Sequence, residues 1–282
     1  MNNTRLILVE GIPGSGKTST AQYIKQIFET IGIPSRLYLE GDLNHPADYE
    51  SVACLNEEEY INMKKRFPDH IETVEKFASP ISSVPDHQLI YYGKLQQEIL
   101  YEKASELINE LRKYDLYNLS LEIYEKLILD KWSDFTRQVE HTQETIILEC
   151  CFIQNPVTLM FGRFNQPEDK ITAFIKKIEQ MTQLLNPELI YFYQDDVKES
   201  LSRVIEERSE EWLQHVIWYF TQQGYGKDMG YQGFDGLCKV MDARKRYELR
   251  IMDHLNLDKL IINNSEYDWN IALVKVRGFL QV

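Results

Sequence analysis

The sequence predicts an α/β fold in which helices cover both faces of a five-stranded parallel sheet and a large helical insertion interrupts the pattern. Stretches with apolar residues at helical spacing separate short β-rich apolar runs, and such alternation is typical of a parallel sheet covered on both faces. Between the second and the third run there is little strand character. The five runs lie at residues 5–10, 35–42, 145–149, 189–194 and 259–263.

The first strand and the first helix frame a glycine-rich loop. "RLILVE" (5–10) is the strand, and "STAQYIKQIFETIG" (19–32) has helical spacing that Gly32 and Pro34 bring to an end. The eight residues from Gly11 to Thr18, "GIPGSGKT", match the pattern G-x-x-x-x-G-K-[ST] without a gap.

This loop has the chemistry of a phosphate-binding site. Glycines let successive backbone N–H groups point at phosphate oxygens, and the helix N-terminus adds positive potential. Lys17 is expected to reach the β and γ phosphates of a nucleotide, and the Thr18 hydroxyl to ligate Mg²⁺. A glycine-rich turn without a ligand is the alternative. The predicted nucleotide-binding residues are Gly11, Gly14, Ser15, Gly16, Lys17, Thr18 and Ser19.

Residues 43–144 form the predicted insertion. Clear helical periodicity is found in "LQQEILYEKASELINELRKY" and "LSLEIYEKLILDKWSDFTRQVE". "SPISSVPDH" (79–87) is interpreted as a Pro- and Ser-rich turn between helices. The insertion carries 20 Asp and Glu against 11 Lys and Arg, a net charge of −9.

Composition excludes several classes of partner. The whole chain has a net charge of −13, which argues against nucleic acid and anionic membranes because both require a basic surface. There is no apolar run long enough to span a membrane, and the first strand begins too early to leave room for a signal peptide. The four cysteines have no CxxC spacing and suit reduced thiols. We therefore expect a cytoplasmic location.

The order of these motifs resembles the P-loop kinases of nucleotides and small molecules, which include thymidylate, gluconate and adenylylsulfate kinases. The resemblance covers most of the chain outside 43–144. "NPELIYFYQDDVKESLSRVIEERSEEW" (186–212) is similar to their Pro-initiated strand, acidic turn and arginine-bearing helix before a lid. "KLIINNSEYDW" (259–269) is similar to their last strand and adenine-side loop.

The resemblance implies a P-loop NTPase fold, ATP and Mg²⁺ as cofactors, and transfer of the γ-phosphoryl group to a small acceptor. In this interpretation residues 1–282 form a single kinase domain, in which the insertion covers the acceptor and 203–236 is a lid region. The chain departs from thymidylate kinases after the third strand, where it reads Glu149-Cys-Cys instead of Asp-Arg-Tyr or similar. This difference speaks against a nucleoside monophosphate as acceptor.

Two arginines are candidates for stabilising the transferred phosphoryl group. Arg203 and Arg208 lie five residues apart and are expected on one helix, projecting within about 140° of each other. Pairing with neighbouring glutamates on a solvated face is the alternative. The glycine-rich stretch 219–236 is expected to be a flexible segment that closes over the site, or else a plain surface loop.

Three carboxylates follow predicted strands and are candidates for the metal and the acceptor. Because ligands gather at the carboxyl ends of strands in open α/β sheets, Glu40, Asp42 and Glu149 are expected near the site. We assign Glu149 to the Mg²⁺ side and Asp42 to the acceptor hydroxyl, although the roles can be exchanged. Capping of the following turns is the alternative for these acids.

Polar residues after the second and third strands are candidates for reading the acceptor. "EGDLNHP" (40–46) resembles the Gly-Asp-x-x-His-Pro stretch of gluconate-type kinases, whose acid faces a substrate hydroxyl, and places His45 beside the same pocket. A solvated turn histidine is the alternative. Gln154 and Asn155 open the helix after the third strand and are candidates as well, with N-capping before Pro156 as the competing role for Asn155.

The nature of the acceptor stays open at this stage. An insertion as acidic as 43–144 disfavours a phosphorylated acceptor and favours a polyol or an amine, unless its acids are merely solvated helix faces. A nucleoside or nucleotide kinase and a regulatory P-loop ATPase are the competing functions. The regulatory hypothesis is weakened because the last strand ends in Asn-Asn-Ser-Glu rather than Asn-Lys-x-Asp, and the third strand ends in one acid rather than Asp-Glu.

Overall fold

The computed structural model describes residues 4–99 and 101–282, which divide into two compact units. Unit 1 contains the chain up to Glu40 and the segment Thr136–Val282. Unit 2 is the continuous segment Gly41–Phe135.

A five-stranded parallel sheet forms the centre of unit 1 and confirms the predicted sheet. Its strands follow the order β2-β6-β1-β7-β8, so the first strand of the chain is central. All six residues of β1 are buried because the strand has a neighbour on each side and helices above and below. The strands are β1 (Leu6–Gly11), β2 (Ser35–Tyr38), β6 (Thr145–Glu149), β7 (Pro187–Tyr193) and β8 (Asp258–Asn263).

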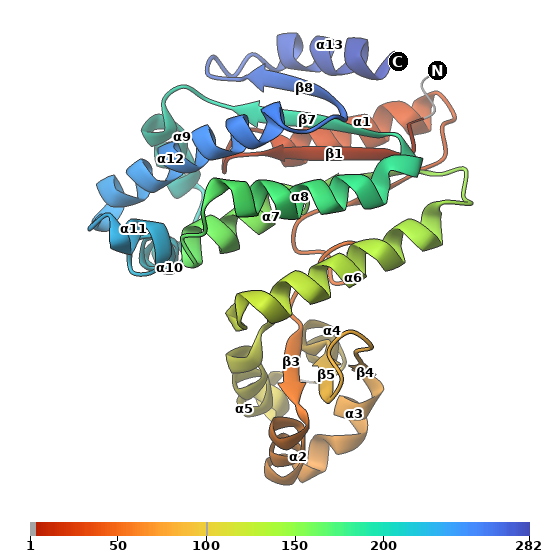
Figure 1. The fold of residues 1–282 in the computed structure, drawn as a ribbon, viewed down its shortest axis with the longest axis vertical. Helices are drawn as coiled ribbons and strands as arrows, with labels where there is room; N and C mark the ends of the chain where they lie inside the picture. Colours follow the sequence, from red (N-terminus) through yellow and green to blue (C-terminus); the bar gives the residue numbers. More distant parts are fainter. Residues whose placement is uncertain (1–3, 100) are drawn as a thin grey trace. The chain divides into compact units, whose positions relative to one another are not determined.

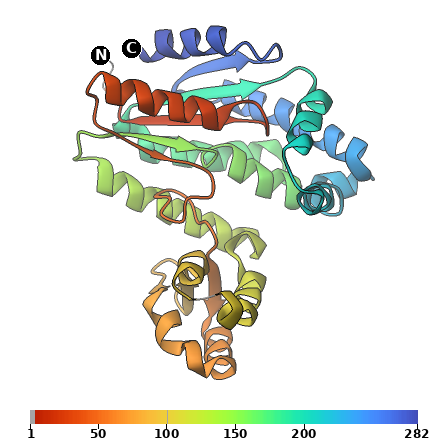
Figure 2. The same ribbon diagram turned by 180° about the vertical axis from the view of Figure 1, so that it is seen from behind.

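Helices cover both faces of this sheet, as predicted (Figures 1 and 2). Alternate residues of β1, Ile7 and Val9, join apolar side chains of α1 (Lys17–Thr30) and α13 (Trp269–Leu280) in one cluster. On the other face lie α8 (Glu168–Thr182) and α12 (Gly233–Asp253), and α12 reaches the sheet through a hydrogen bond between Tyr191 and Glu248.

The remaining helices of unit 1 follow β6 and β7. They are α7 (Gln154–Val157), a π-helical turn (Thr158–Arg163), a 3₁₀ turn (Gln183–Leu185), α9 (Val197–Glu206), α10 (Glu210–Thr221) and α11 (Gly224–Asp228).

The stretch 219–236, expected as a flexible segment or a plain surface loop, is largely helical. Two of its glycines serve close packing: a Cβ on Gly224 would lie 2.2 Å from the Gly162 carbonyl oxygen, and one on Gly226 would lie 1.9 Å from the Phe220 carbonyl oxygen. Its closure over a nucleotide stays a prediction.

Unit 2 is mostly helical, as predicted, but it also contains a three-stranded antiparallel sheet that the sequence analysis did not predict. The strand order is β3-β5-β4. "SPISSVPDH" joins the strands β4 and β5 rather than two helices. The elements of unit 2 are β3 (Ala53–Asn56), α2 (Glu57–Arg66), a 3₁₀ turn (Pro68–His70), α3 (Ile71–Lys76), β4 (Ala78–Pro80), β5 (His87–Ile90), α4 (Tyr92–Glu98), α5 (Tyr101–Leu111), two further 3₁₀ turns (Arg112–Tyr114 and Leu116–Asn118) and α6 (Leu121–Val139), which continues beyond the unit boundary.

Local signals explain where the insertion helices begin. The Asn56 side chain accepts the N–H of Glu59, and the Glu59 carboxylate accepts the N–H of Asn56, which is a reciprocal capping box at the start of α2.

Among residues 4–99 and 101–282, none of the helices has both the length and the apolar character needed to cross a membrane.

Candidate functional site

The predicted phosphate loop connects β1 to α1 and requires glycine at several positions. Gly11, Gly14 and Gly16 have φ angles of +144°, +75° and +104°, which L-residues with a Cβ rarely adopt. A Cβ on Gly11 would lie 2.2 Å from the Phe192 carbonyl oxygen, and one on Gly16 would lie 1.8 Å from the Trp269 ring. Backbone conformation and space therefore both select glycine.

The loop presents a set of backbone donors that the chain itself does not use. Within the described ranges, the N–H groups of Gly14, Gly16, Lys17 and Thr18 donate no hydrogen bond, and the first bond of the helix runs from the Thr20 N–H to the Gly16 carbonyl oxygen at 3.1 Å. Free N–H groups and positive potential at the start of α1 together suit an anion.

Lys17 and Thr18 take different partners. The Lys17 side chain is buried, and its Nζ donates to the Ile12 carbonyl oxygen at 3.1 Å rather than to a carboxylate. The Lys17 side chain therefore folds back so that its ammonium group lies against the backbone of the loop. The Thr18 Oγ1 donates to the Glu149 Oε1 at 2.5 Å, so the two predicted metal ligands are side by side.

Glu149 and two of the predicted acceptor residues form one chain of contacts. The buried Glu149 carboxylate accepts the Glu40 N–H at 3.4 Å through its Oε2. The Glu40 Oε1 in turn accepts a hydrogen bond from the Gln154 Nε2 at 3.1 Å. Since β2 ends at Tyr38, Glu40 lies beyond the strand and not within it as the sequence indicated.

Asp42 and His45 belong to unit 2. The Asp42 Oδ1 accepts the Asn44 N–H at 2.8 Å, which is the turn-capping contact given above as the alternative. His45 is buried and not solvated: its Nδ1 accepts the Ala47 N–H at 3.2 Å. Burial lowers the pKa of His45 to about 4, a shift that Asp42 opposes and Lys131 reinforces, so the imidazole is neutral near pH 7.

The competing role of Asn155 as an N-cap before Pro156 was wrong. The helix α7 begins one residue earlier, at Gln154, and Asn155 lies inside it, donating its N–H to the Cys150 carbonyl oxygen at 3.0 Å.

The expectation that both arginines share a helix was also wrong. Arg203 lies on α9, where it pairs with Glu199 at 2.5 Å and its guanidinium covers the Tyr267 ring, 3.8 Å from the centroid. α9 ends at Glu206, and Arg208 lies in the following turn against the Trp212 ring. The break arises because Ser209 caps a new helix, accepting the Trp212 N–H at 3.3 Å.

Two residues that the sequence analysis did not select donate hydrogen bonds to backbone carbonyl groups of the loop. The Gln194 Nε2 donates to the Gly14 carbonyl oxygen at 3.2 Å, and the Asn264 Nδ2 donates to the Ser15 carbonyl oxygen at 3.1 Å. Both side chains are buried and follow β7 and β8 directly. For Gln194 the available signal was a polar residue immediately after a buried strand, whereas β8 before Asn264 is a largely exposed edge strand.

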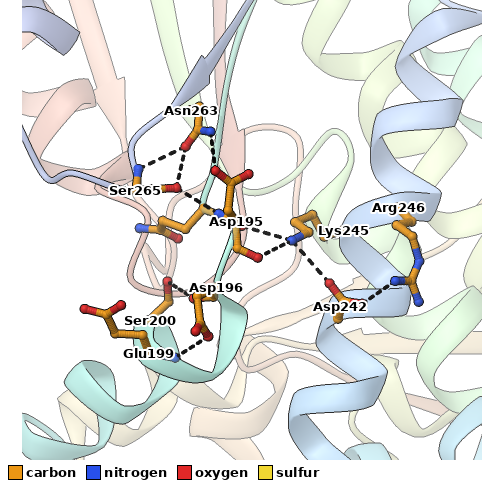
Figure 3. Close-up of polar contacts among 10 residues, drawn as sticks. Asp195, Asp196, Glu199, Ser200, Asp242, Lys245, Arg246, Asn263 and Ser265 are labelled. Atoms are coloured by element: carbon orange, nitrogen blue, oxygen red, sulfur yellow. Dashed lines mark hydrogen bonds and ion pairs between the residues drawn. The ribbon is translucent and has the colours of Figure 1, made fainter.

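A polar network fixes the ends of the same two strands (Figure 3). Lys245 on α12 donates to the Gln194 and Asp195 carbonyl oxygens at 3.0 and 2.9 Å. On the other side, Asn263 donates to Asp195 at 2.8 Å and accepts from Ser265. The segment after β7, which contains Gln194, is thus anchored both to α12 and to the end of β8.

We expect Asn264→Ala to lower the free energy of unfolding by about 1–3 kcal/mol, because the Ser15 carbonyl then loses its donor. Urea unfolding followed by circular dichroism measures this. Asn270→Ala, at an exposed position on α13, is the matched control and should change stability by no more than about 0.5 kcal/mol. Equal losses in both variants would contradict the bracing role.

A comparison with protein-family models finds none that matches this chain, and a comparison with curated proteins finds no significant match.

Proposed function

We propose that this protein is a P-loop kinase that transfers the γ-phosphoryl group of Mg-ATP to a small-molecule acceptor, with a hydroxyl as the receiving group. The observation that carries the proposal is the loop Gly11–Thr18: a strand-to-helix turn with unused N–H donors, a buried lysine and a threonine bonded to Glu149.

The loop residues suit a polyphosphate. The N–H groups of residues 14 and 16–18 can each donate to a phosphate oxygen, and the Lys17 ammonium can exchange its bond to the Ile12 carbonyl for one to a phosphate. Catalysis of phosphoryl transfer consists mainly of positioning and of placing positive charge around the moving group. Arg203, whose guanidinium covers the Tyr267 ring, is an arginine candidate for the nucleotide side, because its helix α9 contacts the loop where a Cβ on Gly14 would lie 2.5 Å from Val204.

The donor set suits Mg²⁺ held jointly by protein and phosphates. Thr18 and Glu149 supply a hydroxyl and a carboxylate, which are the hard oxygen ligands that this ion prefers. Across the described residues there is no cluster of three or more His, Cys, Asp or Glu that could hold a metal alone. When bound, Mg²⁺ would neutralise phosphate charge, with Thr18 and Glu149 as its protein ligands.

Gln154 supports a hydroxyl as the acceptor group. Its Oε1 is buried and accepts no hydrogen bond from the described residues, while its Nε2 is engaged with Glu40. One hydroxyl of the acceptor can donate to this oxygen. The reacting hydroxyl passes its own proton to a carboxylate as its oxygen forms the new bond to the γ-phosphorus and the bond between that phosphorus and ADP breaks. Within unit 1 the candidate carboxylate is Glu40, and Asn155 is a further candidate for contacting the acceptor. Asp42 and His45 belong to unit 2, and their part in acceptor binding stays a prediction from the sequence.

Incubation with Mg-ATP and pooled metabolites tests the proposal. We expect one class of metabolite to gain about 80 Da, the mass of a transferred phosphoryl group, by mass spectrometry. A reaction without added protein is the control. Nucleoside monophosphates as sole acceptors would favour the nucleotide-kinase alternative, and ATP hydrolysis without any acceptor would favour a regulatory ATPase.

A further inference from the structure

The turn that follows β6 is held in a strained conformation between two residues of the candidate site. Cys150, directly after Glu149, has a φ angle of +69°, which is unfavourable for a residue with a Cβ. Its N–H donates to the Val9 carbonyl oxygen at 3.2 Å. The turn ends at Gln154, where α7 begins.

Glu10 fills the inside of this turn. The residue is fully buried, and its two carboxyl oxygens accept the Phe152 and Gln154 N–H groups at 2.8 Å each. Burial raises the pKa of Glu10 to about 8; the two backbone N–H groups oppose the shift and the Glu248 carboxylate adds to it. An apolar side chain would avoid this desolvation but would leave both N–H groups buried and unpaired.

The location of the turn gives this contact a functional meaning. On one side of the turn Glu149 reaches Thr18, and on the other side Gln154 reaches Glu40. Glu10 itself immediately precedes Gly11, the first residue of the phosphate loop. One buried carboxyl group therefore ties the loop strand to the turn that carries the predicted metal ligand.

We propose that Glu10 is a positioning residue, whose paired hydrogen bonds to the Phe152 and Gln154 N–H groups hold Glu149 beside Thr18 for Mg²⁺-nucleotide binding. This inference rests on the proposed function. Glu10 acts through the backbone and does not touch the nucleotide.

Helix α12 supports the same turn through the backbone carbonyl group of Gln154. The Arg244 Nη2 donates to the Gln154 carbonyl oxygen at 3.0 Å, and its Nε donates to Glu248 at 2.7 Å. The Tyr191 hydroxyl donates to the second oxygen of Glu248 at 2.6 Å. Gln154 is thus held at its N–H by Glu10 and at its carbonyl by Arg244, which fixes the direction of its side chain.

Glu179 offers a matched control within unit 1. Its buried carboxylate also accepts two backbone N–H groups, those of Asn256 and Leu257 at 2.5 and 2.9 Å, but both through Oε1. These residues precede β8, so Glu179 lies at the amino edge of the sheet, opposite to the phosphate loop. Because Glu10 uses both of its oxygens, Glu10→Gln loses one backbone hydrogen bond, whereas Glu179→Gln could keep both bonds through its amide oxygen. Glu179→Met, which removes both bonds at the opposite edge of the same sheet, is therefore the control.

The experiment is calorimetric titration of the full chain with a non-hydrolysable ATP analogue, with and without Mg²⁺. Glu10→Gln places an NH₂ group against one backbone donor, so we expect the gain in affinity caused by Mg²⁺ to fall about tenfold. Affinity without Mg²⁺ should stay within about twofold, because the loop N–H groups and Lys17 are unchanged. Glu179→Met should leave both affinities at the wild-type values, although it leaves two buried N–H groups unpaired and loses stability.

Glu10→Asp is the second variant and separates the carboxyl group from its reach. Aspartate keeps the carboxyl group but is one methylene shorter and cannot serve both donors, so we expect the same loss as for Glu10→Gln. A wild-type Mg²⁺ effect that both Glu10 variants retain overturns this inference and leaves the proposed function standing. A Glu179→Met variant with an equal loss of the Mg²⁺ effect also overturns it, since the effect would then be general destabilisation. A wild-type protein that binds no analogue overturns the proposed function itself.

Discussion

Replacement of Lys17 by alanine is expected to reduce ATP binding about 100-fold or more, to the point where turnover is lost. The Lys17 Nζ lies over the loop, bonded to the Ile12 carbonyl, and is the buried cation among the loop residues that can neutralise phosphate charge. A hydrogen bond to a charged group contributes about 1.5–3 kcal/mol to binding, and removal of a donor to charge that develops in the transition state lowers the rate about 100- to 1000-fold. Calorimetric titration with Mg-ATP measures the binding, and release of ADP measures the turnover.

Lys25→Ala is the control for this experiment. Lys25 lies two turns further along α1, is partly exposed and pairs with Glu29 at 3.0 Å, a surface pair worth about 0–1 kcal/mol. We expect it to bind ATP as the wild type does. A fully active Lys17→Ala variant would reject the assignment of the phosphate loop.

Replacement of Arg244 by methionine is expected to lower the free energy of unfolding by about 3–5 kcal/mol. Arg244 and Glu248 form an ion pair at 2.7 Å in which both side chains are essentially inaccessible to solvent. Removal of one partner leaves the other as an uncompensated buried charge, which is far more costly than the net value of the intact pair. Urea unfolding at fixed pH measures the loss, and a lower melting temperature should accompany it.

Arg246→Met provides a matched comparison on the same helix. Arg246 pairs with Asp242, but more than half of its side chain is exposed, so the expected loss is about 0–1 kcal/mol. The double variant Arg244→Met with Glu248→Gln should recover part of the stability, because the unpaired charge is gone and the Tyr191 hydroxyl still has an acceptor. Equal losses for Arg244→Met and Arg246→Met would contradict this account.

The central sheet could be predicted from the sequence because burial on both faces leaves a continuous apolar run. β1, β6 and β7 are such runs, and their predicted positions agree with the structure to within one or two residues. The sheet of unit 2 could not be found in this way. Its strands have three or four residues, too few to show alternation, and β4 ends at Pro80, which the sequence indicated as part of a turn.

The loop was predictable because all its parts are contiguous, whereas its supports are distant in sequence. Gln194 and Asn264 act on the loop carbonyls, and Glu10 on the backbone of a turn far along the chain. A single polar residue beside a strand does not reveal which backbone group it meets. The end of α9 before Arg208 was readable in principle, since Ser209 followed by two glutamates is a helix-start signal.

The interrupted path of unit 1 has a consequence for how the chain is made. β1 is the central strand, and its neighbours β6 and β7 are separated from it by the whole of unit 2 or more. As the ribosome delivers residues from the amino end, β1 and its phosphate loop emerge first but find no partner until residues 145–193 have followed. Pairing of strands that are so far apart in sequence is slow, because a long loop must close before any contact between the strands stabilises it. The strand that later carries the phosphate loop is therefore the one that stays exposed longest during translation.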